Sequence, residues 1–306
     1  MSYRPLLLRL GRMLLPLGVL AVVLSLIDPG AALSRIASAR IWPLLGALAL
    51  AQLVILGSAW RWQVTVQALG QALPRRHAVG EYYLASLFNI VLPGGVGGDA
   101  LRVWRGRLAH GTGPALRGVM IERFSGQVML ALVLLAGLGG SGARDDSVGL
   151  VAVFVAGLAC LGALLVFGAR LPGSPGRALA GFGVDLRRLA RAGRAMGQLL
   201  ALNLIVVAAL IGSFWLCTRA VGTEMPLSAA LIVIPLCLAA MLVPAGLGGL
   251  GLREGAAAAL WPLAGFAADA GVAASLLFGL VHLVAALPAL YLLARPHSGA
   301  DRRAAR

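Results

Sequence analysis

The 306-residue sequence predicts an all-α integral membrane protein with about six transmembrane helices and two re-entrant hairpins that form an inverted repeat. Hydrophobic residues make up 60% of the chain, and the mean hydropathy is +0.91. Charged residues make up only 12%, whereas an ordinary soluble domain carries about 25%. Several apolar stretches reach the roughly 20 residues that a helix needs to cross a bilayer. This composition excludes disordered, collagen-like, disulfide-framework and cytosolic proteins.

Six segments are predicted to cross the membrane completely, and only the first of them, which carries Arg9 and Arg12, contains an acidic residue or an arginine. They lie at residues 6–27, 41–60, 124–140, 148–169, 199–218 and 271–294. Small residues at 37–39 follow the first segment, as at a signal-peptide cleavage site. We favour an uncleaved first helix, because the later charges need that crossing to balance.

Two further apolar segments are interrupted before they span the membrane. Residues 82–92 run into a glycine-rich stretch at 93–99, and residues 227–243 run into 244–251, ahead of an apolar stretch at 255–266. Proline and closely spaced glycines end helices. Irregular backbone inside a bilayer is tolerated only within protein or beside a wet cavity. Both segments are therefore predicted to be re-entrant hairpins, each entering and leaving on one side.

Charge distribution supports this topology. The net charge is +15, and all 26 basic residues are arginine. With a cytoplasmic N-terminus and six crossings, 21 arginines fall inside, and the five outside are Arg35, Arg40, Arg144, Arg219 and Arg253. Cytoplasmic loops carry such an excess. The sequence thus predicts an inner-membrane protein with both termini cytoplasmic, a membrane domain over 1–295 and a basic tail over 296–306.

The arginines are interpreted as contacts with anionic headgroups at the cytoplasmic face. No basic-aromatic module typical of nucleic-acid binding is present, so no nucleic-acid partner is expected. The arginine-rich stretch at 177–194 alternates with apolar residues. It predicts either a basic interfacial helix or a solvated loop.

The two breaks align at an offset of 151 residues. Pro93 matches Pro244 and Arg102 matches Arg253, and four further identities within residues 93–102 are Gly95, Gly97, Gly98 and Leu101 with Gly246, Gly248, Gly249 and Leu252. Three predicted crossings separate the hairpins, so they enter from opposite faces. Secondary transporters build substrate sites from such inverted repeats of broken helices. Close helix packing through glycine is the alternative.

Ionisable residues accompany both breaks, and intramembrane charges are costly unless paired. Asp99 or Glu122 is expected to pair with Arg102 or Arg123. Glu122 and Arg123 open the next predicted crossing. Glu254 is expected to pair with Arg253 or with an arginine of the first hairpin. The predicted substrate-binding or translocation residues are Glu81, Asn89, Pro93, Gly97, Gly98, Asp99, Arg102, Glu122, Arg123, Pro244, Gly248, Gly249, Arg253 and Glu254. The alternative places these charges at the interface, where they orient helices.

No catalytic residue, metal site or cofactor is predicted. The glycines at 246–251 match a dinucleotide-binding pattern, but a membrane helix cannot supply the strand that this pattern requires. Histidines are scattered and no CxxC occurs. A lipid-modifying enzyme would use Glu81, Asp99 or Glu122 as acid or base, but no nucleophile–base pair is visible.

The motifs at 89–102, at Glu122-Arg123 and at 244–254 resemble the flippase-like domain family, the transmembrane region of lysylphosphatidylglycerol synthases. The resemblance covers about residues 1–295. In the synthases it implies movement of aminoacylated phosphatidylglycerol between leaflets. Stand-alone relatives resemble helpers of glycolipid, polyprenol-linked sugar or hopanoid pathways. Because the chain ends soon after the last predicted crossing, no aminoacyl-transfer domain and no enzymatic activity are expected.

Two functions follow as expectations. The first is a lipid flippase without its own ATP hydrolysis, whose substrate is a membrane lipid of the anionic, aminoacylated or polyprenyl-linked kind. The second is a non-catalytic membrane partner of a cytoplasmic glycosyltransferase or lipid synthase. Such a partner would dock on the arginines of the 177–194 stretch, which include Arg187, Arg188, Arg191 and Arg194.

Overall fold

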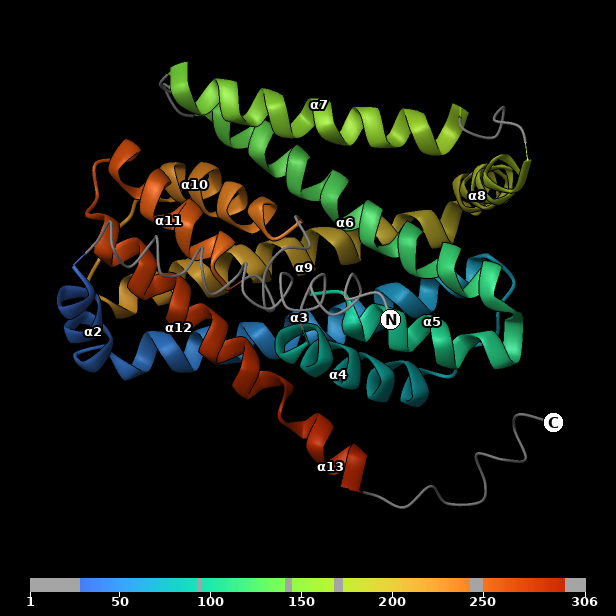
Figure 1. Cartoon of the computed structure of the whole chain (residues 1–306), viewed down its shortest axis with the longest axis horizontal. Coiled ribbons are helices and arrows are strands. Elements are labelled where there is room, and N and C mark those ends of the chain that lie inside the picture. The colour runs from blue at the N-terminus through green and yellow to red at the C-terminus, as the bar shows by residue number, and fades with distance from the viewer. Residues whose placement is uncertain (1–27, 93–94, 141–144, 168–172, 243–249, 295–306) are drawn as a thin grey trace, which may run out of the picture.

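The computed structural model describes residues 28–92, 95–140, 145–167, 173–242 and 250–294, and its elements are helices (Figure 1). They are α2 (Pro29–Ala37), α3 (Ile41–Ala68), α4 (Arg75–Val91), α5 (Gly97–His110), α6 (Thr112–Gly140), α7 (Asp145–Phe167), α8 (Gly173–Arg191), α9 (Gly193–Ala220), α10 (Leu227–Ala240), α11 (Leu252–Leu263), α12 (Ala268–Ala286) and α13 (Pro288–Ala294). The predicted all-α class is confirmed.

Four described stretches are long and apolar enough to cross a membrane: Ile41–Ala68, Thr112–Gly139, Gly193–Ala220 and Ala268–Ala294. Each contains one of the predicted crossings. The predicted crossing at 148–169 falls on α7, whose apolar stretch is Val148–Leu164. The predicted crossing at 6–27 lies outside the described residues. The chain is a multi-pass, all-α membrane protein.

Two helices extend well beyond the crossings predicted within them. The helix that contains the second crossing continues past residue 60, because α3 ends at Ala68. The helix that contains the third begins before residue 124, because α6 begins at Thr112. Helices can continue past single charged residues when neighbouring helices pair those charges. As a result Arg61, Glu122 and Arg123 lie within long helices rather than at their ends.

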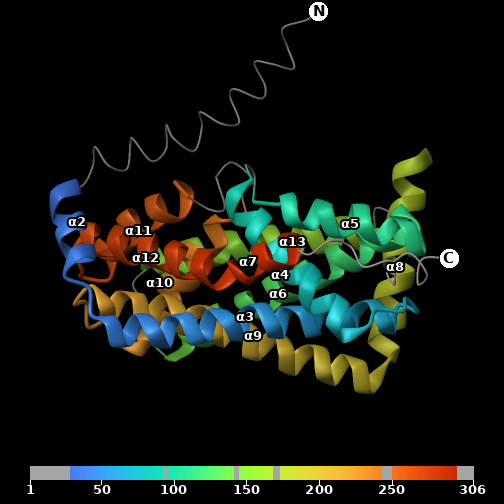
Figure 2. The same ribbon diagram turned by 90° about the horizontal axis from the view of Figure 1, so that it is seen from below.

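The long helices α3 and α9 pack along each other as an antiparallel pair at one face of the molecule (Figure 2). Small residues line their seam. A Cβ on Gly57 would lie 2.9 Å from Val206, and one on Gly212 would lie 3.0 Å from Leu50. The Ser213 hydroxyl also donates to the Ala47 carbonyl across the seam, at 3.0 Å. Helices in lipid associate through close approach at small residues and through interhelical hydrogen bonds, because burying apolar surface there contributes little free energy of association.

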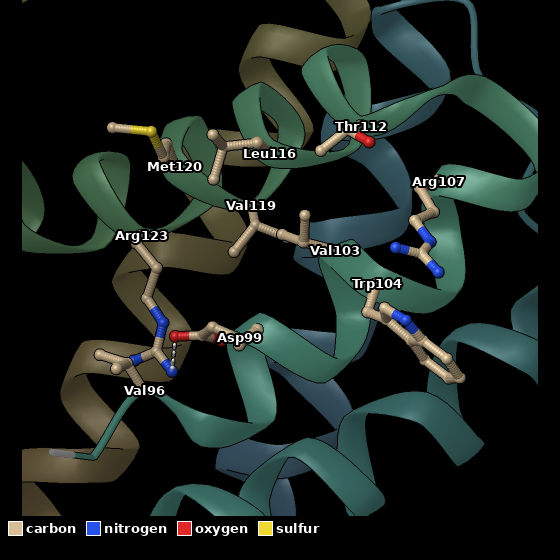
Figure 3. Close-up of a pocket in the computed structure, with 11 residues that line it drawn as sticks. Val96, Asp99, Val103, Trp104, Arg107, Thr112, Leu116, Val119, Met120 and Arg123 are labelled. Atoms are coloured by element: carbon tan, nitrogen blue, oxygen red, sulfur yellow. Dashed lines mark ion pairs between the residues drawn. The ribbon is translucent and has the colours of Figure 1, made fainter. Parts of the chain in front are cut away.

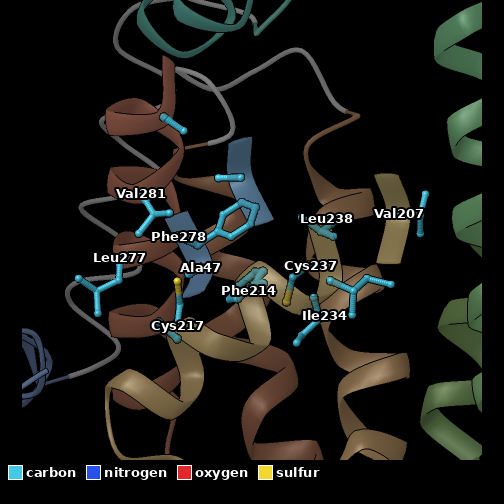
Figure 4. Packing of buried hydrophobic residues seen from close by; sticks show 14 of the residues in the cluster. Ala47, Val207, Phe214, Cys217, Ile234, Cys237, Leu238, Leu277, Phe278 and Val281 are labelled. Carbon is cyan, nitrogen blue, oxygen red and sulfur yellow. The ribbon is translucent and has the colours of Figure 1, made fainter. Parts of the chain in front are cut away.

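The buried core lies between this pair and helices α10, α11 and α12 (Figure 4). Phe214 of α9 stacks on Phe278 of α12 with ring centroids 4.8 Å apart, and on Trp261 of α11 at 5.8 Å. Cys217 and Cys237 are buried here as free thiols. The core therefore fixes the second broken hairpin against the crossing helices.

The molecule has two distinct ends. At the end that we call the α8 end, Arg188 of α8 donates to the Leu69 carbonyl and Gln71 donates to the Pro114 carbonyl. At the opposite end, which we call the α2 end, Arg35 pairs with Asp269 and the Arg40 amide donates to the Ala220 carbonyl. Helices α3, α6, α9 and α12 run between these ends (Figure 1).

The two broken segments enter from opposite ends. Helices α4 and α5 pack together, and both the start of α4 and the end of α5 lie at the α8 end (Figure 1). Helices α10 and α11 also pack together, and the start of α10 and the end of α11 lie at the α2 end. The arrangement matches the predicted inverted pair of re-entrant hairpins.

Candidate functional site

The start of α5 is held against α4 by close packing and one polar side chain. The Asn89 side-chain oxygen accepts from the Gly98 amide at 2.7 Å and from the Asp99 amide at 3.4 Å. A Cβ on Gly98 would overlap the Ala85 carbonyl, so only glycine permits this approach. These contacts position Asp99 and Arg102 on α5 to face α6.

Five charged residues then converge in what we call the first charge centre: Arg61, Asp99, Arg102, Glu122 and Arg123. Glu122 of α6 is fully buried, at 0% exposure. Its Oε2 accepts from both terminal nitrogens of Arg102 at 3.2 Å, and its Oε1 pairs with Arg61 of α3. Asp99 bridges Arg102 and Arg123, with 2.7 Å between its Oδ2 and Arg123 Nη2. The predicted pairing of acids and arginines at this break is confirmed.

Three helices contribute uncharged partners to the first charge centre. Tyr82 of α4 donates to Glu122 Oε1 at 3.3 Å, and Asn203 of α9 accepts from Arg61 Nη1 at 2.9 Å. The Arg102 guanidinium lies 4.7 Å from the Tyr82 ring centroid and 4.9 Å from that of Trp62. Aromatic faces attract guanidinium groups, most strongly where water is excluded. Helices α3, α4, α5, α6 and α9 thus all meet at this point.

Sequence reasoning missed several members of this centre. Arg61 counts as a loop charge if the second crossing ends at residue 60. The signal for its true place is the apolar run beyond it, where Val64, Val66 and Ala68 continue the helix. Asn203 and Tyr82 carry no such signal, because single polar residues in apolar helices reveal nothing about their partners.

A second ion pair joins the arms of the first hairpin nearer the α8 end. Arg105 Nη1 lies 2.6 Å from Glu81 Oε1, and His77 approaches the same oxygen at 3.8 Å. Glu81 is buried, and its other oxygen has no hydrogen-bond partner among the described residues. Arg105 thus fastens α5 to α4, and Glu81 does not join the first charge centre.

A groove lies between α5 and α6, beside the first charge centre (Figure 3). Its volume is about 490 Å³. The lining is mostly apolar, with Asp99 and Arg123 at one end and Arg107 and Thr112 at the other (Figure 3). The full lining is Val96, Asp99, Ala100, Val103, Trp104, Arg107, Thr112, Leu116, Val119, Met120 and Arg123. We call it the α5–α6 groove.

A second charge centre lies at the start of α11. Arg253 pairs with Glu254 at 2.8 Å, and both contact Ser275 of α12, whose hydroxyl accepts from Arg253 Nε at 2.7 Å and donates to Glu254 at 2.8 Å. Glu254 also accepts from the Gly251 amide at 2.7 Å. Both charged residues are buried. Of the two predicted partners of Glu254, the structure shows the adjacent Arg253.

The aligned arginines Arg102 and Arg253 occupy similar surroundings. Each is 2% exposed, each pairs with a fully buried glutamate, and each lies over an aromatic ring, Phe278 at 5.0 Å in the second case. The predicted positions Pro93, Pro244, Gly248 and Gly249 lie outside the described residues. Gly97 is the first residue of α5 and, as a glycine, has no side chain to contribute to either centre. The part of the chain that is described holds no cluster of metal-ligating residues.

Comparison with known proteins places this arrangement in a family. The sequence family described as Lysylphosphatidylglycerol synthase TM region matches residues 10–289, which include both hairpins and both charge centres. No curated protein matches the chain.

Proposed function

The chain belongs to the Lysylphosphatidylglycerol synthase TM region family, and from that premise we propose that it moves a membrane lipid from one leaflet of the bilayer to the other. One observation carries the proposal. A helix breaks within the membrane-spanning bundle, and five charged side chains converge beside the break. A chain that served only as an apolar scaffold would have no reason to retain such a costly cluster.

The paired hairpins support the same proposal. Broken helices that enter from opposite ends are the elements from which secondary transporters build a midplane site. Here the second hairpin carries its own buried arginine–glutamate pair. Two similar centres in inverted repeats give the molecule two related positions on one route across the bilayer.

The orientation belongs to the proposal as well. Exposed arginines gather at the α8 end, among them Arg75, Arg76, Arg187, Arg188, Arg191 and Arg194. Positive loops face the cytoplasm, so we assign the α8 end to the cytoplasmic side of an inner membrane, with both termini on that side. As a further part of the proposal, the substrate is a lipid of anionic, aminoacylated or polyprenyl-linked chemistry. The chain is proposed to move this lipid without acting as an enzyme.

Lipid movement by the purified full-length chain in liposomes tests the proposal. The assay follows a fluorescent phosphatidylglycerol and an impermeant quencher that reaches only the outer leaflet. Wild-type protein should render inner-leaflet lipid accessible. Asp99→Asn should abolish this movement, because Asp99 bridges Arg102 and Arg123. Asp269→Asn is the matched control, since it removes an ion pair at the α2 end that contacts neither centre. Movement at the wild-type rate in Asp99→Asn would reject the site.

A second candidate function rests on helix α8. Its arginines 187, 188 and 191, with Arg194 just beyond, are all exposed, and three of them border a surface hollow of about 450 Å³ with Val184. Such a face suits an acidic surface of a cytoplasmic glycosyltransferase or lipid synthase. Replacing the four arginines with glutamine should then abolish co-purification of an enzyme. Retention of the enzyme after that change would exclude this docking face.

A further inference from the structure

The α5–α6 groove leaves the side chain of an arginine accessible at a point far from the α8 end. Arg117, six residues earlier on α6, pairs with Asp185 of α8 and marks the level of that helix. At about 1.5 Å of rise per residue, Arg123 lies about 9 Å deeper along α6 than Arg117, and about 16 Å from Thr112. The Arg123 side chain is nevertheless 44% exposed. A charged group inside a bilayer is unfavourable unless it is paired. Asp99 meets the Arg123 guanidinium at 2.7 Å, but Asp99 also pairs with Arg102, so the two guanidiniums share one carboxylate.

The first charge centre lacks one negative charge. Three guanidiniums, those of Arg61, Arg102 and Arg123, share the two carboxylates of Asp99 and Glu122. Hydrogen bonding shows the same deficit, because the buried Nε of Arg102 and Nε1 of Trp62 have no acceptor among the described residues. Of the three guanidiniums, Arg123 is the one that opens onto the groove (Figure 3). The centre is therefore short of one anionic acceptor, at a place that a ligand can reach.

The rest of the groove suits an acyl chain and its attachment. Val96, Leu116 and Met120 present exposed apolar surface. Nearer the α8 end, Arg107 lies over the ring of Trp104 at 5.2 Å, as basic and aromatic residues do at the level of lipid headgroups. Charged groups thus mark both ends of an apolar path from the α8 end to Arg123.

We propose that the α5–α6 groove binds one phospholipid and selects it by a phosphodiester that carries one negative charge, which pairs with Arg123. The proposal rests on the proposed function and names the substrate class of that site. The phosphate displaces Asp99 from Arg123, while Asp99 keeps its pair with Arg102. No carboxylate is left unpaired in the exchange, and the centre becomes electrically neutral. Lipids without a phosphate have no means of completing the centre.

Lipid retention by the purified full-length chain tests this selection. Native mass spectrometry would compare phosphatidylglycerol with diacylglycerol of the same acyl chains. Phosphatidylglycerol should be retained preferentially, and Arg123→Gln should weaken its retention about tenfold, the effect of losing a charge-assisted hydrogen bond. Arg123→Lys should keep most of it. Arg219→Gln is the matched control, because Arg219 also lies over a tryptophan at 5.2 Å but sits at the end of α9, at the α2 end.

Two further variants distinguish the effect of the ion pair at Arg123 from the effect of filling the groove. Asp99→Asn should strengthen phosphatidylglycerol retention, since the competing carboxylate is gone, even though it stops lipid movement. Ala100→Phe should weaken retention by filling the groove at an exposed position without altering any charge. Inorganic phosphate in excess should not displace the lipid, because the acyl chain contributes to binding.

The outcomes also distinguish this inference from the proposed function. Equal retention of both lipids, unchanged retention in Arg123→Gln, an equal loss in Arg219→Gln, or displacement by inorganic phosphate would each overturn the inference. If Arg123→Gln retains phosphatidylglycerol normally and the wild-type protein moves lipid in liposomes, the inference fails and the proposed function stands. If phosphatidylglycerol is retained selectively but never moves, the binding site stands and the proposed function fails.

Discussion

Arg102 and Arg123 lie on neighbouring helices and share Asp99, yet their surroundings assign them different roles. Arg102 is 2% exposed, enclosed by Glu122, Asp99 and two aromatic rings. Arg123 is 44% exposed beside a groove. Arg102 therefore holds four helices together, namely α3, α4, α5 and α6, whereas Arg123 is available to a ligand.

This difference predicts the effect of Arg102→Ala. Removing one partner of a buried ion pair typically costs about 3–5 kcal/mol, because the other charge stays buried without a counter-charge. We expect Arg102→Ala to lower the thermal unfolding temperature of the detergent-purified protein strongly. Arg35→Ala breaks a partly exposed pair with Asp269 and should cost about 0–1 kcal/mol. Equal unfolding temperatures for the two variants would contradict the role assigned to Arg102.

At this scale the sequence predicts which residue types pair but not the complete set of partners. Asp99 and Arg102 could be found because they lie at a proline–glycine break, and Glu122 and Arg123 because they open the next predicted crossing. Arg61 and Asn203 lie 61 and 81 residues from Glu122 on helices without any break. Only the three-dimensional packing of α3 and α9 brings them to the site.

Among the elements, α8 shows how one helix serves two environments. Its inner face buries Phe182 and Leu189 against Leu69, Ile121 and Leu199. Its outer face carries the arginines. The pattern of alternating arginines and apolar residues is equally compatible with an interfacial helix and with a solvated loop. The structure shows the helix, because α6 and α9 supply the apolar surface that covers its small inner face.

This packing predicts a local effect of Phe182→Ala. Truncation of a buried phenylalanine typically costs about 3–5 kcal/mol, and the loss should fall mainly on the docking of α8. Because α8 carries several arginines, we expect faster trypsin cleavage there while the remaining helices stay resistant. Val184→Ala, at a position that is 51% exposed, should cleave at the wild-type rate. Uniform cleavage along the chain in Phe182→Ala would contradict local release.

For the whole molecule, the decisive feature is that each hairpin begins and ends at the same end of the bundle, α4–α5 at the α8 end and α10–α11 at the α2 end. A complete crossing by α4 and α5 would put Arg76 and Thr112 on opposite sides of the membrane. A re-entrant hairpin puts both at the α8 end. Apolar length and charge counting predicted this arrangement, since proline and glycine mark the breaks. The helix boundaries were less predictable, because packing extended α3 and α6 beyond their apolar cores.

Cysteine labelling in intact cells tests this topology. Single cysteines at Arg76, Thr112 and Glu224 are introduced into a variant without native cysteines, all three sites being exposed. Arg76→Cys and Thr112→Cys should behave alike toward an impermeant maleimide, and Glu224→Cys, at the α2 end, should behave oppositely. If Arg76→Cys and Thr112→Cys label from different sides, α4 and α5 span the membrane and the inverted repeat is wrong.

The composition of the first charge centre also sets an order on biosynthesis. A ribosome delivers the chain from its N-terminus, so Arg61 emerges 61 residues before Glu122, and Arg102 emerges 20 residues before it. Until Glu122 arrives, Arg61 lacks its carboxylate partner and Arg102 has Asp99 alone, so the α4–α5 hairpin lacks one of its two counter-charges. Asn203 arrives later still, 142 residues after Arg61. The first charge centre, whose first member is made early in synthesis, is therefore completed only when α9 has entered the membrane.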